Sequence, residues 1–334
     1  MNLITGATGL VGSYLAKLLI SKGEKVRALK RSTSDTSLLG NFVTQIEWVE
    51  GDVLDICSLE EAMRGVKNLY HCAAVISFIP SAINYMMKVN VEGTANVMNV
   101  ALASNVQRVM HVSSVAAFGL PLNGKMIDED FSDPNINKSF WYYKSKHYGE
   151  REVWRAYEEG LKVVIVCPST IIGAGWWDAE PNSLFREIYK GLKFYTSSTN
   201  GFVDVRNVVA CMYQLMQTDI IGEKFILNAE NLSFKDMIWM MADEMKVKRP
   251  AIEAGRFLRA VAWRTEAFKS FFTTQRPLIT KESAELAAIN FTYSNEKIKR
   301  TLNCDFIPVK KTIAETAAVF LQSIKEQREF GVFD

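Results

Sequence analysis

Cysteine and histidine are scarce in this sequence, and their scarcity argues against two kinds of scaffold. The 334 residues include five cysteines and three histidines, and no two cysteines form a CxxC pair. The cysteines are scattered, mostly in apolar stretches, at Cys57, Cys72, Cys167, Cys211 and Cys304. Because such residues are typical of reduced, buried thiols, we expect neither a disulfide framework nor a structural metal. A predicted strand already begins at Met1, which leaves no room for a signal peptide, and we expect a cytoplasmic protein.

A strong net charge and a long apolar run are also missing. The formal net charge is +2, which gives no broad electrostatic attraction for nucleic acid. No apolar stretch approaches the roughly 20 residues that cross a bilayer, so we expect no integral membrane segment. These absences leave a globular protein that acts on a small-molecule substrate, with a homodimer as an open possibility.

The amino terminus carries a glycine-rich turn between a strand and a helix. Residues 1–5 are apolar, TGATGLVG begins at residue 5, and residues 10–20 have the apolar spacing of a helix. Gly6 can adopt the backbone angles of the turn, Gly9 lets the main chain approach a pyrophosphate, and Gly12 lets the helix pack against the strand. The anion then lies on free N–H groups at the helix N-terminus. The segment predicts a dinucleotide site with contacts from Gly6, Thr8, Gly9, Leu10, Val11 and Gly12.

Basic residues follow the second predicted strand, residues 25–30. An NAD-specific site places Asp or Glu there for the ribose 2′-hydroxyl, whereas this chain has Lys30, Arg31 and Ser32. A guanidinium forms paired hydrogen bonds with a phosphate, so Arg31 favours NADP. A solvated basic loop is the alternative, and Asp35 lies close enough to keep NAD as the second choice of cofactor.

Two further segments are expected at the dinucleotide. Asp52 and Val53 follow the third strand, and Asp52 could accept a hydrogen bond from the adenine amino group. Its alternative role is to cap a helix that starts at Ser58. Ala73 and Ala74 end the next buried strand, where their small side chains leave room for the nicotinamide ribose.

The most informative pair is Tyr142 and Lys146, because residues four apart share one face of a helix. A nearby positive charge lowers a tyrosine pKa from about 10 towards working pH, as a carbonyl acid or alcohol base requires. Ser113 and Ser114 follow a strand at 108–113, which a helix at about 82–104 precedes, and open α/β sheets bind ligands at such carboxyl ends. A serine hydroxyl there can donate to a substrate oxygen while Tyr142 supplies a proton. Together the residues predict hydride chemistry.

These motifs resemble the extended short-chain dehydrogenase/reductase superfamily, the NAD-dependent epimerase/dehydratase family. The resemblance covers most of the chain: TGATGLVG, HCAA at 71–74, NVEGT at 90–94, VSSVAAFG at 112–119, YYKSK at 142–146 and PSTIIGAG at 168–175. It implies that Ser114 is the catalytic serine, Tyr142 the acid/base, and Lys146 the lysine that also holds the nicotinamide ribose. It further implies a supporting Asn90 and cofactor contacts from Ser113, Pro168 and Ser169.

The implied fold is α/β, a doubly wound parallel Rossmann sheet with a smaller, discontinuous C-terminal cap domain. We expect the dinucleotide-binding domain at 1–170, with 201–227 returning to it, and the substrate-binding cap at 171–200 and 228–334. Substrate would bind between cap and sheet. Large apolar side chains expected near that mouth, each individually more typical of core packing, are Phe78, Met86, Trp141, Trp176 and Trp177. Their convergence would favour an apolar or aromatic substrate.

Two amphipathic helices are expected in the carboxyl-terminal part. Residues 256–272 place an apolar stripe opposite basic residues, and we expect this helix to close the cap over the pocket. The stripe is Phe257, Val261, Phe268 and Phe271, and the basic residues, which would also suit a membrane surface, are Arg256, Arg259, Arg264 and Lys269. A last helix at about 309–327 has Ile313, Phe320 and Ile324 at core spacing and is expected to be structural.

Three functions remain open. The first is an NADP-dependent oxidoreductase that reduces a ketone or aldehyde on a small, fairly apolar molecule, or oxidises the matching alcohol. PLITKESA at 277–284 and the segment 293–297 resemble the dihydroflavonol reductase and 3β-hydroxysteroid dehydrogenase branch. The second is a nucleotide-sugar epimerase or dehydratase with tightly bound NAD, although the Arg that usually precedes its Phe-Val-Asp segment is absent before Phe202. A catalytically idle NADP sensor is disfavoured because Ser114, Tyr142 and Lys146 are all present. The chain also has Cys167 and Phe118 where the family often has Arg and Tyr, so the resemblance names no substrate.

Overall fold

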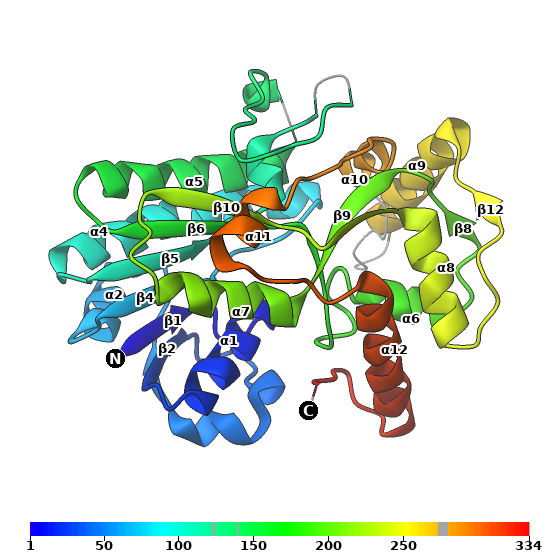
Figure 1. Ribbon diagram of the computed structural model, residues 1–334. Helices are drawn as coiled ribbons and strands as arrows, with labels where there is room; N and C mark the ends of the chain where they lie inside the picture. Colours follow the sequence, from blue (N-terminus) through cyan, green and yellow to red (C-terminus); the bar gives the residue numbers. More distant parts are fainter. Residues whose placement is uncertain (122–123, 139, 273–279, 334) are drawn as a thin grey trace.

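The computed structural model describes residues 1–121, 124–138, 140–272 and 280–333, and a parallel seven-stranded sheet forms its centre (Figure 1). The strand order is β10-β6-β5-β4-β1-β2-β3, so the chain starts in the middle, fills one side and then the other. The strands are β1 (Asn2–Thr5), β2 (Val26–Lys30), β3 (Ile46–Glu50), β4 (Asn68–His71), β5 (Arg108–Val112), β6 (Val163–Pro168) and β10 (Glu223–Leu227). This confirms the predicted doubly wound sheet.

Helices cover both faces of this sheet, because its central strands are apolar on both sides. In β6, residues 163–167 are fully buried. One face packs against α1 (Leu10–Ser21) and α7 (Val205–Met216), and the other against α2 (Ile56–Met63), α4 (Thr94–Ala103) and α5 (Trp141–Glu158) (Figure 1). α11 (Glu296–Leu302) lies beside β10 and α7. The helices hold the carboxyl ends of the strands in fixed relation to one another.

The helix expected at about 82–104 contains a wider turn. α3 (Ile83–Met87) leads into a π-helical turn, η3 (Lys88–Gly93), which continues directly as α4. Such turns occur most often at functional sites, and this one carries Asn90. Short 3₁₀ segments elsewhere are η1 (Ser37–Gln45), η2 (Pro80–Ala82), η4 (Val115–Phe118) and η5 (Ile136–Lys138).

The remaining elements form a second, smaller layer beside the carboxyl edge of the sheet (Figure 1). A three-stranded sheet has the order β11-β9-β7, and a short parallel pair joins β12 to β8. The strands are β7 (Thr170–Ile172), β8 (Phe194–Tyr195), β9 (Thr199–Asp204), β11 (Glu230–Ser233) and β12 (Ile252–Glu253). The helices are α6 (Ser183–Tyr189), α8 (Phe234–Glu244), α9 (Arg256–Phe272), α10 (Lys281–Leu286) and α12 (Val309–Lys325).

The smaller layer has its own apolar core, which includes Phe185, Phe202, Met237 and Phe320. β9 lies in the three-stranded sheet and runs directly into α7, which packs on α1, so the chain crosses between the layers within a few residues. The division into a dinucleotide-binding domain and a cap remains a prediction. We use the term cap layer for β7–β9, β11, β12, α6, α8–α10 and α12.

The last helix departs from its prediction at one position. Ile313 and Phe320 are fully buried, but 41% of Ile324 is exposed, so the expectation that Ile324 belongs to the core was wrong. The helix ends at Lys325, and the chain then turns back so that the Gly331 N–H donates to the Gly175 carbonyl. The returning terminus covers Ser323, which is fully buried, and leaves the neighbouring Ile324 exposed. Among the described residues, no helix is both long and apolar enough to cross a membrane.

Candidate functional site

The glycine turn is shaped by contacts inside the protein as well as by an expected ligand. Gly6 has a φ of +73°, and a Cβ there would lie 2.7 Å from the Ala73 nitrogen. A Cβ on Gly12 would lie 2.2 Å from the Gly6 carbonyl oxygen. A Cβ on Gly9 would come no closer than 3.5 Å to that oxygen, and no side chain caps α1. Gly6 and Gly12 thus fix the turn, while the first N–H groups of α1 have no side-chain acceptor in the described part of the chain and fit an anion.

Arg31 follows β2 at the carboxyl edge of the sheet and is exposed. Its Nη1 donates to the Tyr85 hydroxyl on α3, 2.8 Å away. The guanidinium is thus oriented by a hydroxyl group and not by a carboxylate. Asp35 does not pair with it, because the Asp35 carboxylate accepts the Ser37 N–H and hydrogen bonding to Ser37 lowers the pKa of that carboxyl. No sequence pattern pointed to Tyr85, which lies 54 residues away along the chain.

The alternative role of Asp52 as a helix cap was wrong. Asp55 caps α2, accepting from the Cys57 and Ser58 N–H groups, and the helix starts at Ile56. Asp52 closes its own turn by accepting the Leu54 N–H at 2.9 Å. Its expected contact with adenine stays a prediction, as does that of Val53, which is buried.

Ser114 and Tyr142 meet at the carboxyl end of β5. The Ser114 side chain caps η4 by accepting the Ala116 N–H at 3.2 Å. Burial raises the pKa of Tyr142, and Ser114 opposes this rise. The ring of Phe78 packs edge-on against the Tyr142 ring, with centroids 5.6 Å apart. The serine and the phenol therefore lie together at this edge of the sheet, and their joint action on one substrate oxygen stays a prediction.

Lys146 is buried behind this pair, with 5% of its surface exposed. Its Nζ donates to the Val112 carbonyl at 3.0 Å. Burial lowers the pKa of Lys146 to about 8, and Cys167, Glu150 and Cys72 act in the opposite direction. That Lys146 lowers the pKa of Tyr142 stays a prediction, because in this structure the ammonium donates to β5 and burial of the phenol is the largest effect on its pKa.

Asn90 joins three segments behind the site. Its Oδ1 accepts the Val75 N–H at 2.7 Å, and its Nδ2 donates to the Val75 carbonyl at 2.9 Å and to the Ser145 hydroxyl at 3.0 Å. Ser145 lies next to Lys146 on α5, and the loop that holds Val75 follows Ala73 and Ala74. The structure thus places Asn90 as a support between that loop and α5.

Three other expected cofactor contacts lie at the same edge of the sheet. Pro168 ends β6, and Ser169 is buried with its hydroxyl donating to the Leu227 carbonyl at 3.3 Å. The Ser113 hydroxyl donates to the Glu150 carboxylate at 2.6 Å and is buried. The hydroxyls of Ser113 and Ser169 therefore already have partners within the protein, and their contacts with a cofactor stay predictions. Sequence reasoning missed Glu150, although it follows Lys146 by four residues.

The aromatic residues expected at the mouth do not all lie there. Trp177 is buried in the cap layer, where it packs on Phe185 and Phe320. Trp176 pairs with Phe330 near the carboxyl terminus, with ring centroids 5.2 Å apart. The expectation for Trp177 was wrong because α6 and α12 bury it in the cap layer. The expectation for Trp176 stays a prediction.

The other three mouth residues divide differently. Met86 is fully buried, so it belongs to the core. Phe78 contacts Tyr142, and 42% of Trp141 is exposed with the Lys144 Nζ 4.3 Å from its ring centroid. Phe78 and Trp141 are therefore the two that lie close to the candidate site.

The segment 280–293 brings the cap layer against α5. α10 begins at a capping box between Thr280 and Ser283, and the Glu282 Oε1 accepts the Trp141 N–H at 2.8 Å. Phe291 packs on Tyr143, and its N–H donates to the Thr199 carbonyl of β9. Residues 277–279 of PLITKESA lie outside the described residues. The described part contacts the first turn of the helix that carries Tyr142.

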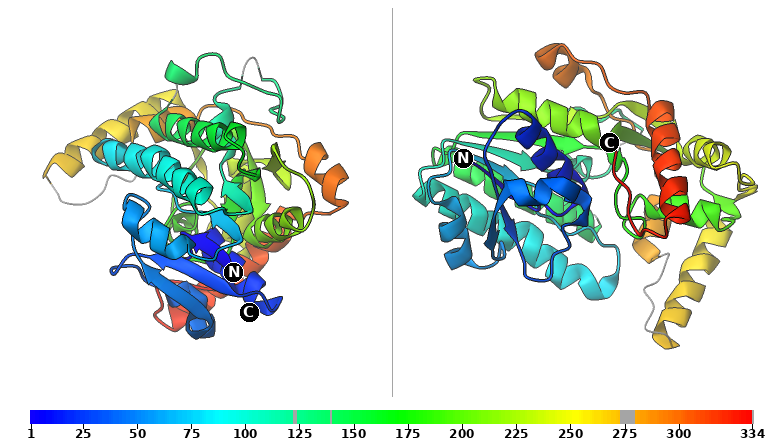
Figure 2. Two further views of the ribbon diagram at one scale, coloured as in Figure 1. Left: turned by 90° about the vertical axis from the view of Figure 1, so that its left-hand side faces the viewer. Right: turned by 90° about the horizontal axis from the view of Figure 1, so that it is seen from below.

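The helix α9 does not close a pocket along its described side chains. Phe257 is 83% exposed and Val261 is 39% exposed, and Figure 2 shows the helix projecting from the body of the molecule. The expectation of a closing helix was therefore wrong for its first turns. The side chains of Phe268, Lys269 and Phe271 lie outside the described residues.

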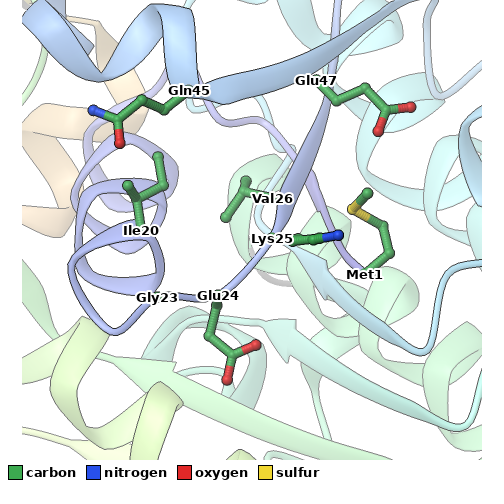
Figure 3. Close-up of a pocket in the computed structure, with 8 residues that line it drawn as sticks. All are labelled: Met1, Ile20, Gly23, Glu24, Lys25, Val26, Gln45 and Glu47. Carbon is green, nitrogen blue, oxygen red and sulfur yellow. The ribbon is translucent and has the colours of Figure 1, made fainter.

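A surface depression shown in Figure 3 lies at the opposite edge of the sheet. Its lining comes from the amino ends of β1 and β2 and from neighbouring segments: Met1, Ile20, Gly23, Glu24, Lys25, Val26, Gln45 and Glu47. Because all strands of this sheet run parallel, their amino ends are remote from Ser114, Tyr142 and Lys146. Ligands of open α/β sheets bind at the carboxyl ends, so this depression is not the candidate site.

Comparison with known proteins decides the family. The family model described as the NAD dependent epimerase/dehydratase family matches residues 2–228, about two thirds of the chain. The chain belongs to this family. As a member of it, the protein is an NAD(P)-dependent oxidoreductase. The match includes the glycine turn, β5 and the α5 helix of the candidate site.

Individual relatives of this NAD dependent epimerase/dehydratase family extend the likeness to the whole chain. A putative dihydroflavonol 4-reductase of Synechocystis sp. is 29% identical, covering 95% of this chain and 93% of that protein. Sterol demethylase protein B of Methylococcus capsulatus is 29% identical, covering 99% of each. The crystal structure of gox2253 is 32% identical with a TM-score of 0.83, covering 96% of this chain and 98% of that one. The cap layer therefore belongs to the shared fold.

Proposed function

We propose that this protein is an NADP-dependent oxidoreductase that reduces a ketone or aldehyde on a fairly apolar molecule, or oxidises the matching alcohol, through Ser114, Tyr142 and Lys146. The observation that carries the proposal is that Ser114 and Tyr142 lie together at the carboxyl end of β5, where Ser114 opposes the rise of the Tyr142 pKa, with a buried lysine behind them. This arrangement offers a donor and a proton to one substrate oxygen.

Each residue has a distinct role in the proposal. The Ser114 hydroxyl donates to the carbonyl oxygen, and the Tyr142 phenol transfers its proton to that oxygen as negative charge develops on it. Lys146 has a pKa of about 8 and is mostly protonated at neutral pH, so its charge favours the phenolate left behind. Asn90 holds the loop at Val75 and Ser145 in place. The bound dinucleotide supplies the hydride.

The dinucleotide would be held at the start of α1 and by the turn from Gly6 to Gly12. The turn supports this because the first N–H groups of α1 have no side-chain acceptor. Arg31, already held by the Tyr85 hydroxyl and without a carboxylate partner among the described residues, would bind the 2′-phosphate of NADP. NAD is the alternative cofactor.

The proposed substrate is an apolar molecule that carries a ring system. Phe78 packs against Tyr142, and the exposed Trp141 ring lies one residue before it. The names dihydroflavonol 4-reductase and sterol demethylase, borne by two relatives, both refer to multi-ring molecules. Aromatic side chains beside the reacting tyrosine would bind such rings.

The competing function is a nucleotide-sugar epimerase or dehydratase that retains NAD. Such an enzyme needs a cation for the diphosphate near β9. Arg206 is the arginine nearest along the chain, and it is already paired with Asp204 and Glu315. A separate arginine would have to come from elsewhere, so the reductase is favoured.

A substrate panel tests the proposal. Purified protein would be mixed with NADPH and cyclic or aromatic ketones and aldehydes, and NADPH absorbance followed, with Tyr142→Phe as the control. We expect turnover with at least one ring-containing carbonyl and none with the control. Thermal shifts with UDP-, GDP- and dTDP-sugars form the opposing arm. Stabilisation by one nucleotide sugar, with co-purified NAD and no NADPH consumption, would overturn the proposal.

A further inference from the structure

Three side chains on one face of α5 contact the carboxyl end of β5 and the residues that follow it. Tyr142 lies beside Ser114, and the Lys146 Nζ donates to the Val112 carbonyl at 3.0 Å. One turn further, Glu150 accepts the Ser113 hydroxyl at 2.6 Å. Residues 142, 146 and 150 lie four apart and share this face. The first two belong to the proposed chemistry, whereas Glu150 has no role in it so far.

Glu150 is a buried carboxylate with an unusually complete set of donors. Only 6% of the residue is exposed. Besides Ser113, its oxygens accept the Trp154 indole N–H at 3.2 Å, and the Lys224 Nζ lies 3.6 Å away. The Cys167 thiol of β6 lies 3.8 Å from the oxygen that Ser113 also binds. Groups from α5, β5, β6 and β10 thus converge on one acid, which compensates the desolvation of its charge.

Glu150 also influences the pKa of Lys146. Burial lowers the pKa of Lys146 to about 8, opposed by Cys167, Glu150 and Cys72. The two thiols oppose the shift only as thiolates, and burial raises the pKa of both, to about 12 for Cys72 and well above the usual value for Cys167. Among the described groups that influence Lys146, Glu150 is therefore the one carboxylate.

The histidines near Lys146 add no negative charge. His71 on β4 and His111 on β5 are buried and stacked, with ring centroids 5.2 Å apart. Burial lowers the pKa of both, and the charge of Lys146 lowers them further. Both rings are therefore neutral at neutral pH. The groups that face Lys146 or its partner from neighbouring elements are Cys72, His71, His111, Cys167, Glu150 and Lys224.

We propose that Glu150 is a positioning residue that keeps Lys146 protonated and holds the Ser113 end of β5, so that Val112 and Ser114 stay in register with α5. The inference rests on the proposed function of Tyr142 and Lys146. A buried lysine without a nearby carboxylate loses its proton more readily. Glu150 thereby sets the upper pH limit of activity without contacting the substrate.

The first test is the pH dependence of turnover in Glu150→Gln. The amide retains the shape and an acceptor for Ser113 but removes the charge. A nearby opposite charge shifts a pKa by about 1 to 3 units, so the basic limb of the kcat profile should move to lower pH by about one unit or more. At pH 8 kcat should fall about tenfold, with KM little changed, and at pH 6 it should approach the wild-type value.

Two control variants separate charge from packing. Trp154→Phe removes another hydrogen bond to the same carboxylate but keeps its charge, so the basic limb should stay in place. Glu150→Asp restores the charge and should return the limb towards the wild-type position. If Glu150→Gln fails to fold, Glu150→Gln with Lys224→Met removes both members of that pair, and the same shift of the limb is expected.

A second readout needs neither cofactor nor substrate. The free energy of unfolding of the ligand-free protein is measured by urea with and without Glu150→Gln, both in a Lys224→Met background, from pH 6 to pH 9. The destabilisation should be largest below pH 7, where Lys146 is charged, and should shrink as the pH rises through 8, where that charge is lost. A merely structural role would give a difference independent of pH.

The outcomes distinguish the inference from the function on which it rests. If Tyr142→Phe and Lys146→Met both keep full activity, the proposed function fails. If these two variants lose activity while Glu150→Gln leaves both the basic limb and the pH dependence of unfolding unchanged, the inference about Glu150 fails and the function stands. A shifted limb together with a pH-dependent destabilisation supports both.

Discussion

Two buried carboxylates, Glu150 and Asp204, belong to clusters of opposite character. Asp204 is 1% exposed and caps α7. Its oxygens accept two side-chain hydrogen bonds from Arg206, at 3.0 and 2.6 Å, and one from the Thr312 hydroxyl of α12 at 2.7 Å. Arg206 also pairs with Glu315, at 2.6 Å. Both carboxylates of this cluster pair with the Arg206 guanidinium, although the Glu315 Oε2 has no hydrogen-bond partner among the described residues, and the cluster joins the central sheet layer to the cap layer.

The cluster around Lys146 and Glu150 leaves its lysine without a carboxylate in direct contact in the described part of the chain. The Lys146 ammonium donates to a carbonyl, and the His111 Nδ1 nearby is buried without a hydrogen-bond partner among the described residues. Burial lowers the pKa of Lys146, the cation of this cluster, whereas hydrogen bonding to Asp204 raises the pKa of Arg206. A cluster whose carboxylates pair with an arginine stabilises the fold, while a buried lysine that donates only to a carbonyl at the carboxyl edge of the sheet is suited to chemistry.

The largest expected effect tests the chemical cluster through Tyr142→Phe. The substitution removes the hydroxyl and its proton but keeps the ring beside Phe78. General acid catalysis contributes about 10² to 10⁴-fold, so kcat should fall by that factor. Steady-state NADPH oxidation measures it, and the melting temperature should stay close to that of the wild type. Half of the wild-type kcat in the variant would contradict the assignment.

Asp204→Ala tests the structural cluster, where the loss should appear in stability. Removing one partner of a buried ion pair costs about 3 to 5 kcal/mol, and the lower end applies because Arg206 is 31% exposed and water screens it. Urea unfolding of the ligand-free protein measures the change. The variant should retain the pH profile of turnover at a temperature where it is folded.

A matched control for this variant is Asp243→Ala. Asp243 also pairs with an arginine, Arg249, at 2.6 Å, but both side chains are about half exposed. The urea midpoint should not change measurably. Equal losses in the Asp204 and Asp243 variants would mean that burial does not distinguish the two pairs.

The same contrast explains what sequence reasoning could reach. The turn at Gly6 and Gly12 and the Tyr142–Ser114 meeting follow from short spacings and from the rule that parallel strands end at one edge. The positions of Trp177 and Ile324 depend on whether a distant segment covers them. The sequence also does not show which buried acceptor Lys146 binds, because several polar groups lie within its reach. The helical spacing from Lys146 to Glu150 can be read from the sequence, but the partners of Glu150 include residues in or next to three separate strands, which the sequence does not bring together.

A pH experiment on stability sharpens the comparison further through Lys146→Met. Lys146 has a folded pKa of about 8, against about 10.4 for an unfolded lysine. Between these values the unfolded chain holds a proton that the folded chain has released, so this lysine makes the free energy of unfolding rise with pH. The slope is up to about 1.4 kcal/mol per pH unit. The penalty for burying the charge is present below pH 8 and is lost as the pH rises.

The measurement is the difference in unfolding free energy between Lys146→Met and wild type at pH 7, 8, 9 and 10. Taking the difference cancels the titration of cysteines and tyrosines common to both proteins. Above pH 8, the free energy of unfolding of the wild type should rise relative to that of the variant by about 1 kcal/mol or more per pH unit. A difference that stays constant would show that Lys146 keeps its proton throughout this range.

A further prediction concerns Arg31, which is exposed and belongs to neither cluster. Replacing Arg31 with Asp puts a carboxylate where we propose that the 2′-phosphate binds. Hydrogen bonds to charged groups contribute roughly 1.5 to 3 kcal/mol, so the ratio of the Kd values for NADPH and NADH should rise at least tenfold. Fluorescence titration of the ligand-free protein measures both constants without any turnover.

Tyr85→Phe separates the charge of Arg31 from its position. The phenylalanine keeps the ring but removes the hydroxyl that accepts the Arg31 Nη1 hydrogen bond at 2.8 Å. Because the guanidinium remains and only its orientation is released, NADPH should weaken by a smaller factor than in Arg31→Asp, and NADH should be unaffected. Equal weakening of both dinucleotides by Arg31→Asp would instead assign Arg31 to the part that they share, and the preference for NADP would then have to come from another residue.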